Sequence, residues 1–454
     1  MSKAVKIRRG LNIALQGNAD KVHANANEAK QYAIKPTDFH GLMPKLVGKE
    51  GHKLKAGSVL FYDKYNESIK YASPVSGEIS EIRRGEKRKI LEVIITPDGK
   101  DSFEKHDVAD PNDLSREEIL EKMLASGLWP FIKMRPVDIV ANPTDNPKMI
   151  VVSAFDSHPL APDYNFLLKD EQEAFQSGIN ALNKLTEGSV HLNIRGEKKQ
   201  NSIFEQCKNV QINLFGGVHP CGNVGVQIHH IDPINKGEVV WTVNPSDVAT
   251  IGKFFMSGRF DTDRVVALTG SKVNEPRYLK TKIGASIESL VKDNIEADNV
   301  RIISGNVLTG DMTNDKGFVG YYHHQITVVP EGDHHKFFLT DGWLSLGFNR
   351  FSMSMAYPTM LNAPSKKWDL DTNLNGEERA FVVSEQYEKV FPFDIYPVFL
   401  LKSILTNDID GMEKLGIYEV APEDFALCEF VCTSKINSQK IIRDGLDIIK
   451  EECL

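Results

Sequence analysis

The chain has 454 residues, of which 41% are hydrophobic and 26% are charged. This length favours three or four domains, each large enough to bury a core of its own. The net charge of −8 disfavours nucleic acid as a partner, because an acidic protein repels the phosphate backbone. No low-complexity tract indicates disorder.

The cysteine content points to a reducing compartment. Five cysteines, an odd number spread over a long chain, are typical of free thiols rather than a disulfide framework. The N-terminus has no apolar signal core, and no segment reaches the about 20 apolar residues that span a bilayer. We therefore expect a cytoplasmic protein that cannot move an ion across a membrane by itself.

The first hundred residues predict β-hairpins. Short apolar runs at 58–62, 68–72 and 93–95 are separated by turn residues, with Pro97-Asp98-Gly99 closing the set. Strand runs at this spacing indicate a small barrel or sandwich.

The pattern changes after residue 110. Ser115 and Glu118 form a capping box, which predicts a helix that ends at Gly127. We expect strands and helices to alternate from there, as in a mainly parallel, loosely Rossmann-like sheet. The expected strands are 137–141, 149–152, 190–194, 210–215 and 239–243, and the expected helices are 171–185 and one starting at Asn244-Pro245.

The rest of the chain predicts two further units. Strands at 264–268 and 301–303 bracket an expected helix at 286–294, which indicates a compact α+β unit. A second strand-rich stretch is expected from 317 to about 349. From Asn375 onward the pattern predicts helices broken by Pro392, Pro397 and Pro422, and so a C-terminal helical bundle.

Several short motifs carry a family resemblance in a collinear order. They are Lys6-Ile7-Arg8-Arg9-Gly10-Leu11, Ser126-Gly127-Leu128-Trp129, Thr186-Glu187-Gly188, Asp263-Arg264-Val265-Val266, Val307-Leu308-Thr309-Gly310 and the stretch from Glu423 to Cys432. Together they resemble the A subunit of the Na+-translocating NADH:quinone oxidoreductase. The resemblance runs from end to end of the chain, and it extends to the C subunit of the Rnf complex and the flavin-binding subunit of respiratory complex I.

This resemblance implies a multidomain α/β fold in four parts. A biotinyl/lipoyl-like β barrel would span 1–105, and a Rossmann-like α/β domain 106–257. A β-grasp domain of the soluble-ligand-binding type, with a strand-rich extension, would span 258–350. A C-terminal helical domain would span 351–454.

The resemblance also implies a function. The complex transfers electrons from NADH to quinone and exports Na+, with its flavins and iron centres in partner subunits. This chain would sit peripherally on the inner face of the bacterial cell membrane, cover the membrane-embedded B subunit and help to shape the quinone site. A purely structural role in assembly and an independent NADH-dependent flavoenzyme remain as alternatives. The residues name no catalytic acid, base or nucleophile.

The loop after the first expected helix departs from the related flavin sites. Those relatives use a glycine-rich loop whose backbone amides approach a phosphate. Here Gly127 is the one glycine, Pro130 and Pro136 remove amide donors, and Trp129 and Phe131 fill the space. We therefore expect no flavin or NADH at this loop. Gly127, Trp129, Phe131 and Arg135 are candidates for contact with a quinone ring, and core packing is the plainer interpretation.

A second glycine-rich stretch, Phe215 to Gly225, follows an expected strand as a nucleotide loop would. Its spacing is not Gly-x-Gly-x-x-Gly, and Pro220 interrupts it. Because the stretch follows a strand, Gly216, Gly217 and His219 are candidates for phosphate binding, but these departures from the motif favour a structural or interface loop.

Metal binding finds little support in the residue spacing. His219, Cys221 and His229 include suitable ligand types, yet no Cys-x2-Cys or His-x3-His pair appears. Cys428 and Cys432 lie one helical turn apart, whereas an iron–sulfur cluster needs about four thiolates. We expect no metal site and no tightly bound cofactor on this chain.

Overall fold

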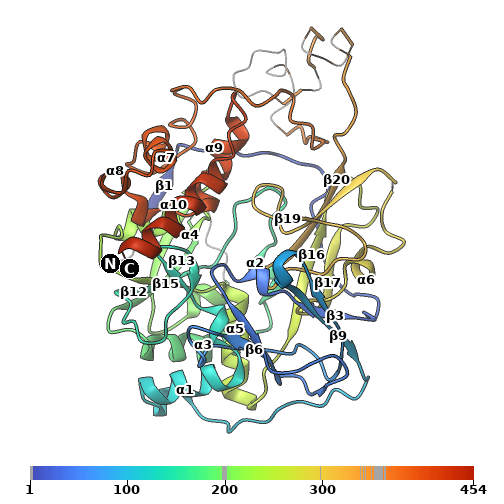
Figure 1. Cartoon of the computed structure of the whole chain (residues 1–454), viewed down its shortest axis with the longest axis vertical. Coiled ribbons are helices and arrows are strands. Elements are labelled where there is room, and N and C mark those ends of the chain that lie inside the picture. The colour runs from blue at the N-terminus through green and yellow to red at the C-terminus, as the bar shows by residue number, and fades with distance from the viewer. Residues whose placement is uncertain are drawn as a thin grey trace.

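The computed structural model describes residues 4–453 except 197–201, 297, 338, 341, 343, 349, 352–360 and 362–364. Four sheets organise the molecule, and the helices near the C-terminus gather at one end of it (Figure 1).

Two small sheets form the N-terminal β unit. One sheet has the order β3-β9-β8-β5 and the other the order β4-β6-β7, and both are antiparallel. Their strands confirm the hairpins predicted for this region. The bounds are β3 Tyr32–Ile34, β4 Pro44–Leu46, β5 Lys53–Leu54, β6 Val59–Asp63, β7 Lys70–Ala72, β8 Gly77–Arg84 and β9 Ile90–Pro97, with 3-10 turns η1 Pro36–Asp38 and η2 Glu86–Arg88.

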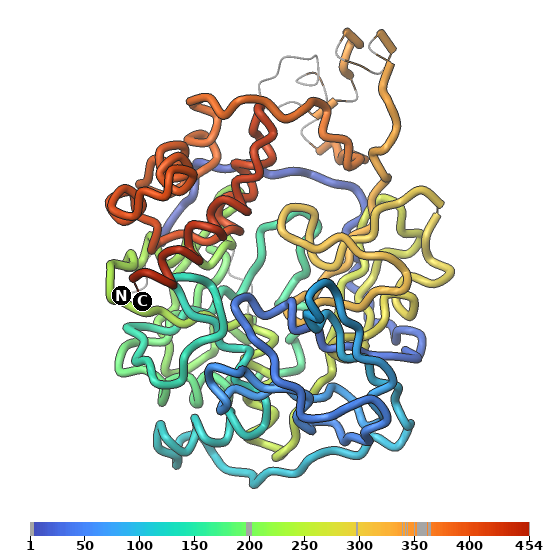
Figure 2. Tube along the Cα trace, viewed as in Figure 1, coloured from blue at the N-terminus to red at the C-terminus, as the bar shows by residue number. Residues whose placement is uncertain are grey.

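Two early strands leave this unit and join other sheets, which the sequence pattern did not predict. Strand β1 (Ala4–Ile7) pairs in parallel with β14 (Gln211–Gly217). Strand β2 (Asp20–Asn25) pairs in parallel with β17 (Arg277–Lys282). The N-terminal segment therefore crosses the molecule from one large sheet to another (Figure 2).

A seven-stranded sheet with the order β1-β14-β13-β12-β15-β10-β11 forms the second unit. Strands β1, β14, β13, β12 and β15 are parallel, and β10 and β11 close one edge in antiparallel pairing. This confirms a mainly parallel sheet. The further bounds are β10 Lys133–Arg135, β11 Ile139–Val140, β12 Met149–Ser153, β13 Ser189–Arg195 and β15 Val240–Thr242.

Helix α1 (Arg116–Ser126) begins and ends where the sequence predicted. The amide of Ser115 donates to the Glu118 carboxylate at 2.8 Å, and the Glu118 amide donates to Ser115 Oγ at 3.3 Å. Gly127 ends the helix with a φ of +79°, a left-handed conformation that glycine adopts without steric cost.

The strand predicted at 137–141 is wrong in its first half. Val137 and Asp138 have positive φ values of 78° and 53°, so only Ile139 and Val140 are extended. A β-branched residue in this conformation is strained, and surrounding contacts must hold it there. One such contact is the hydrogen bond that the Arg443 guanidinium donates to the Val137 carbonyl at 2.6 Å.

Helices α3 and α5 confirm the two further helices predicted for this unit, whereas the short helices α2 and α4 were not predicted. Asn244 caps α5 through the amide of Ser246, with Pro245 as the first helical residue. The bounds are α2 Tyr164–Leu167, α3 Gln172–Lys184, α4 Val224–Ile231 and α5 Pro245–Ser257, with 3-10 turns η3 Pro111–Asp113, η4 Trp129–Phe131 and η5 Ile203–Gln206.

A six-stranded mixed sheet with the order β19-β18-β20-β16-β17-β2 forms the third unit. Its helix is shorter than the 286–294 predicted, since α6 covers Ile287–Val291 only. Among the described residues from 331 to 350 there is no strand, so the strand-rich stretch ends at β20 rather than near 349. The bounds are β16 Asp263–Thr269, β18 Val300–Ser304, β19 Asp311–Thr313 and β20 Gln325–Pro330.

The C-terminal helices begin later than predicted. Residues 375–396 contain turns and no helix, and the first helix is α7 at Pro397–Leu405. Helix α7 packs its buried side chains on α10, where Gly445 lies against the side chain of Ile404. The bounds are α8 Ile409–Lys414, α9 Ala426–Val431 and α10 Ser438–Cys453, with 3-10 turns η7 Ile417–Glu419 and η8 Pro422–Phe425.

None of the helices in the described part of the chain has the length and apolar character needed to cross a membrane.

Helices α3 and α5 touch through their backbones, and two glycines permit it. A Cβ atom at Gly252 would lie 1.7 Å from the Ala174 carbonyl oxygen, and one at Gly178 would lie 2.0 Å from that of Val248. We expect Gly252→Ala to force the helices apart and to destabilise this unit by about 3 kcal/mol. Thermal unfolding followed by circular dichroism measures the loss.

Gly376→Ala is the matched control, because its Cβ would meet only the flexible end of Lys435 at 3.3 Å. Equal unfolding temperatures for the two variants would contradict the close helix contact.

Candidate functional site

The parallel sheet reverses its strand order beside β12. The chain adds β13 and β14 on one side of β12 and then returns to place β15 on the other side. At such a switch point the connections leave the strand ends in opposite directions and open a crevice, where open α/β sheets bind ligands. A ligand site is therefore expected at the carboxyl ends of β12 and β15.

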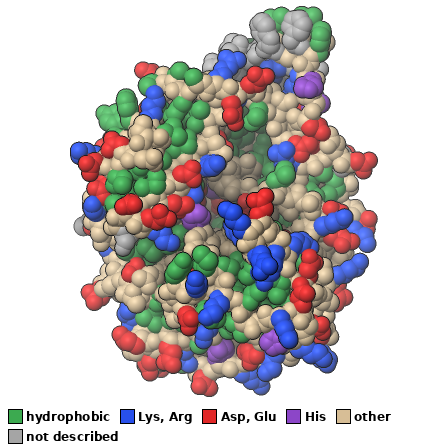
Figure 3. All heavy atoms as spheres, in the orientation of Figure 1, with side chains coloured by type: hydrophobic (Ala, Val, Ile, Leu, Met, Phe, Trp, Pro, Cys, Tyr) green, Lys and Arg blue, Asp and Glu red, His purple; other side chains and the backbone are tan. Residues whose placement is uncertain are grey.

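A cavity of about 210 Å³ lies at this point. Segments following both strands line it, and the β10 edge, the loop before β20 and turn η8 supply further walls. On the molecular surface, a hollow separates the C-terminal helices from the strands of the six-stranded sheet (Figure 3). The lining residues include Phe131, Lys133, Arg135, Asp138, Ser153, Phe155, Asp156, His158, Tyr164, Asn223, Thr242, Asn244, Asp247, Tyr322 and Glu423.

Asp156 and His158 form a buried acid–imidazole pair in the loop after β12. The Asp156 carboxylate contacts His158 Nδ1 at 2.6 Å and accepts the His158 amide at 2.8 Å. Although burial alone would raise the pKa of Asp156, the charge and hydrogen bonds of His158 lower it to about 2. Burial opposes the charge on His158, yet Asp156 raises its pKa above 6.5.

The other ring nitrogen of His158, Nε2, is buried and has no hydrogen-bond partner. The Asn223 side-chain oxygen is also buried and unpartnered, at the amino end of α4. Both residues line the cavity. Buried polar atoms are normally paired, so two unpaired atoms on one cavity suit a ligand that carries hydrogen-bonding groups.

Arg135 occupies the cavity wall as a buried cation surrounded by carboxylates. Its guanidinium lies 2.6 Å from Glu423, 3.5 Å from Asp424 and 3.5 Å from Asp138. Burial opposes the guanidinium charge, but the three acids together raise the pKa of Arg135 above its ordinary value. Burial and the Glu423 charge outweigh the attraction of Arg135 and raise the pKa of Asp424 to about 7.

A second buried ion pair involves Asp247, which also lines the cavity. Arg264 lies 2.9 Å from the Asp247 carboxylate and 2.5 Å from His324 Nε2. Burial and the adjacent guanidinium hold the pKa of His324 well below its ordinary value, so this imidazole is neutral. The Arg264 guanidinium carbon also lies 5.8 Å from the Phe131 ring centroid, which fixes the ring on the cavity wall.

The structure separates the four quinone candidates into two pairs. Phe131 and Arg135 line the cavity. Trp129 is completely buried, donates its Nε1 hydrogen to the Ala141 carbonyl at 2.7 Å and packs edge-on against Trp241. Gly127 lies against Ala72, since a Cβ there would be 2.7 Å from the Ala72 Cβ. Gly127 and Trp129 thus support the loop, while Phe131 and Arg135 face the cavity.

The three candidates at the second glycine-rich stretch all make packing contacts inside the protein. Gly217 pairs with Ile7, and a Cβ there would lie 2.0 Å from the Ile7 carbonyl oxygen. Gly216 pairs with Lys6 in the same strand contact. His219 is buried, with Nδ1 2.9 Å from Ser157 Oγ and its ring 4.5 Å from that of His158. Burial and the His158 charge hold the pKa of His219 well below its ordinary value.

Sequence reasoning missed Asp156, His158 and Asn223. The available signal was the polar run Asp156-Ser157-His158, which begins four residues after the buried strand predicted at 149–152. Residues that follow the carboxyl ends of parallel strands often bind ligands, so the position of this run predicts ligand-binding side chains. Asn223 had no comparable signal, because its burial depends on the packing of Glu423 against it.

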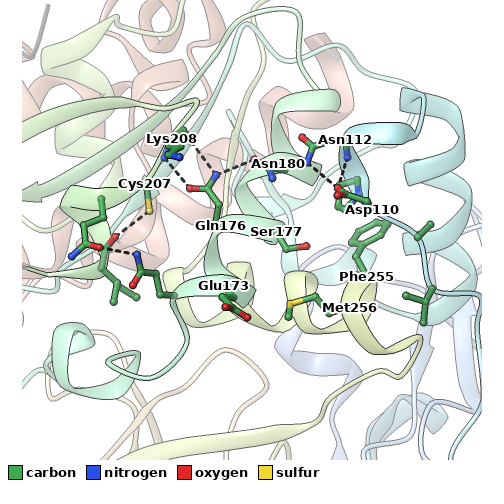
Figure 4. Close-up of a pocket in the computed structure, with 16 residues that line it drawn as sticks. Asp110, Asn112, Glu173, Gln176, Ser177, Asn180, Cys207, Lys208, Phe255 and Met256 are labelled. Atoms are coloured by element: carbon green, nitrogen blue, oxygen red, sulfur yellow. Dashed lines mark hydrogen bonds between the residues drawn. The ribbon is translucent and has the colours of Figure 1, made fainter.

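A wider groove of about 690 Å³ lies away from the switch point, between α3 and residues 108–112. Its polar groups bond to one another, as Figure 4 shows for Gln176, Asn180 and Lys208. Burial raises the pKa of the Cys207 thiol to about 12, so it is not a nucleophile at neutral pH. Its one thiol is therefore unreactive at neutral pH, and the polar side chains at its centre bond to one another.

Within the described ranges, no three side chains of His, Cys, Asp or Glu come together as a metal site would require. Cys428 lies in α9 and Cys432 is the first residue after that helix, and both are buried.

Three family models match the chain, and they define the class of protein. These are the NqrA N-terminal barrel-sandwich hybrid domain at 5–98, the NqrA second alpha/beta domain at 114–260 and the NQRA C-terminal domain at 265–315. The chain is thus a multidomain α/β protein with a barrel-sandwich N-terminal domain.

Relatives that match over their full length identify the particular family. The A subunit of the Na(+)-translocating NADH-quinone reductase of Hahella chejuensis is 38% identical over 453 residues, which is 99% of this chain and 100% of the relative. Those of Cellvibrio japonicus and Haemophilus influenzae are both 37% identical, with the same shares of each chain covered. This chain belongs to the NqrA family, which comprises the A subunits of the Na(+)-translocating NADH-quinone reductases.

The buried Asp156–His158 pair predicts a pH-dependent stability. The lowered pKa of Asp156 contributes stability above its ordinary value of 3.8, and this is lost as pH falls through about 2. The raised pKa of His158 contributes stability below 6.5, and this is lost as pH rises through the folded value. We expect Asp156→Asn to cost about 2 kcal/mol at pH 5 and less at pH 8. Thermal unfolding at both pH values measures the difference.

Asp170→Asn removes an exposed carboxylate from the turn between α2 and α3 and should leave both unfolding temperatures close to the native values. If Asp156→Asn lowers the free energy of unfolding equally at pH 5 and pH 8, His158 is not charged in the folded protein.

Proposed function

We propose that this chain is a peripheral subunit of a membrane complex that couples electron transfer from NADH to quinone with Na+ export. The chief support is the end-to-end match to proteins named for that activity. On this proposal the chain lies on the cytoplasmic side and docks on the membrane-embedded B subunit. Its five cysteines, all in the part of the chain that the structure describes, form no disulfide, which suits that compartment.

The proposal includes a quinone site at the switch-point cavity. The observation that carries it is the unpartnered Nε2 of His158 in a cavity walled by aromatic rings. A quinone has a flat ring and two carbonyl oxygens that accept hydrogen bonds. A protonated His158 donates from Nε2 to one carbonyl, while Phe131 and Tyr322 face the ring.

Arg135 has a different role in this proposal. Its guanidinium is already paired with three carboxylates, so it positions Glu423 and the cavity wall rather than binding quinone as a free cation. Lys133 lies 4.4 Å from the Tyr322 ring centroid and 3.8 Å from Asp138, and it is the more accessible cation on the cavity. Trp129 and Gly127 keep the loop in place.

Flavins and iron centres belong to the partner subunits on this proposal. The loop at 127–136 is filled by Trp129 and Phe131, whose buried rings occupy the space that a phosphate would need. We expect the purified chain to show no flavin or iron–sulfur absorption bands in its visible spectrum. Flavin bound in a one-to-one ratio would favour the independent flavoenzyme instead.

The quinone site is tested by Phe131→Leu in the assembled complex. Loss of the ring contact should raise the KM for quinone about tenfold, which corresponds to about 1.4 kcal/mol. NADH oxidation by an artificial acceptor should stay unchanged, because it does not use the quinone site. Steady-state kinetics with both acceptors measure the two effects.

Phe254→Leu is the matched control, since Phe254 is equally buried and does not line the cavity. If both variants lose the two activities in parallel, the effect is on folding and the quinone site is wrong. A photoreactive quinone that labels no residue of this chain would leave a purely structural role in assembly as the function.

A further inference from the structure

Apolar side chains are exposed mainly near one end of the molecule. Thirteen of the twenty large hydrophobic side chains exposed among the described residues lie between 337 and 430. That segment is about a fifth of the chain, so the exposure is concentrated rather than scattered. Contiguous exposed apolar area marks interaction surfaces, whereas single exposed residues do not.

The best-defined part of this region is helix α7 with the segment before it. Tyr396 and Phe399 are 67% and 51% exposed, with ring centroids 6.2 Å apart. Val382 and Val383 are more than half exposed, and the adjacent Phe381 ring lies 5.6 Å from Lys402 Nζ on α7. We use the name α7 surface for the exposed apolar side chains of Val382, Val383, Tyr396, Phe399 and Leu405. Figure 3 shows hydrophobic side chains gathered over the C-terminal helices.

The exposure does not come from a poorly packed helix. Val398, Leu400, Leu401 and Ile404 of α7 are all buried. The helix is therefore anchored on its inner side and presents aromatic rings outward. Such rings supply large contact area at low cost in side-chain entropy, as binding hot spots do.

The charge around the α7 surface decides between a lipid layer and a protein. Residues 374–410 carry seven acidic and three basic side chains, a net charge of −4. Anionic headgroups of a cytoplasmic leaflet would repel such a surface. In contrast, the cytoplasmic loops of membrane proteins carry an excess of Lys and Arg, and these are complementary to it.

We propose that the α7 surface is the docking site for a membrane-embedded partner protein. The partner presents an apolar patch ringed by Lys and Arg on its cytoplasmic loops. This inference rests on the proposed function, since it assumes a partner in the membrane. The rings of Tyr396 and Phe399 fill the centre of the contact, and the acidic side chains form a salt-sensitive rim.

The test uses Phe399→Asp in the full complex. The variant should reduce the amount of this chain that co-purifies with tagged membrane subunits at least tenfold. Met312→Asp is the matched control, because Met312 is 71% exposed on β19 and lies outside the α7 surface. It should co-purify as the native chain does. Equal thermal unfolding of the isolated variants excludes a folding defect.

Two further measurements separate the alternatives. Raising NaCl from 0.1 M to 0.5 M should weaken the native association, because salt screens the acidic rim. Vesicles of phosphatidylglycerol should not bind the isolated chain, and binding that Phe399→Asp abolishes would identify a lipid surface instead. Full retention of Phe399→Asp would overturn this docking site alone. Failure of the native chain to co-purify with any membrane subunit would overturn both the docking site and the proposed function.

Discussion

The position of the C-terminal helices on the parallel sheet depends on the buried ion pairs of Arg135. Arg135 comes from β10 at the sheet edge and binds Glu423 and Asp424 from turn η8, so it fastens the C-terminal helices to the parallel sheet. Removing one partner of a buried ion pair typically costs about 3–5 kcal/mol, because the remaining charges lose their compensation. Arg443 of α10 strengthens the junction through Asp138 and the Val137 carbonyl.

This junction also shapes the cavity. Arg135 and Asn223 both bond to Glu423 and hold turn η8 at the cavity, and Gly225 leaves room for the neighbouring Asp424. A Cβ at Gly225 would lie 2.5 Å from an Asp424 carboxylate oxygen. The cavity is therefore a property of several units together, with walls from the sheet, the loop before β20 and the C-terminal turn. Small-molecule sites commonly occur between domains for the same reason.

The two surfaces of interest have different physical characters. The cavity combines aromatic walls with buried, unpaired polar atoms, which suits a ring that carries hydrogen-bond acceptors. The α7 surface combines exposed rings with a net negative charge, which suits an apolar protein face bordered by cations. A peripheral subunit needs both kinds of surface if it binds a small molecule and a large partner.

The sequence by itself determined the local elements and the family. Three local features depend only on residues a few positions apart in the sequence, and the structure contains all of them. They are the capping box at Ser115, the left-handed Gly127 and the helix start at Asn244-Pro245. Only tertiary structure placed β1 and β2 in distant sheets, because these strand pairings join residues far apart in the chain, Ala4 with Leu214 and His23 with Tyr278. It likewise decided that Trp129 is core while Phe131 faces the cavity, and it brought His158 and Asn223 together. These outcomes depend on contacts between elements that are distant in the sequence, and the spacing of residues along the chain does not specify those contacts.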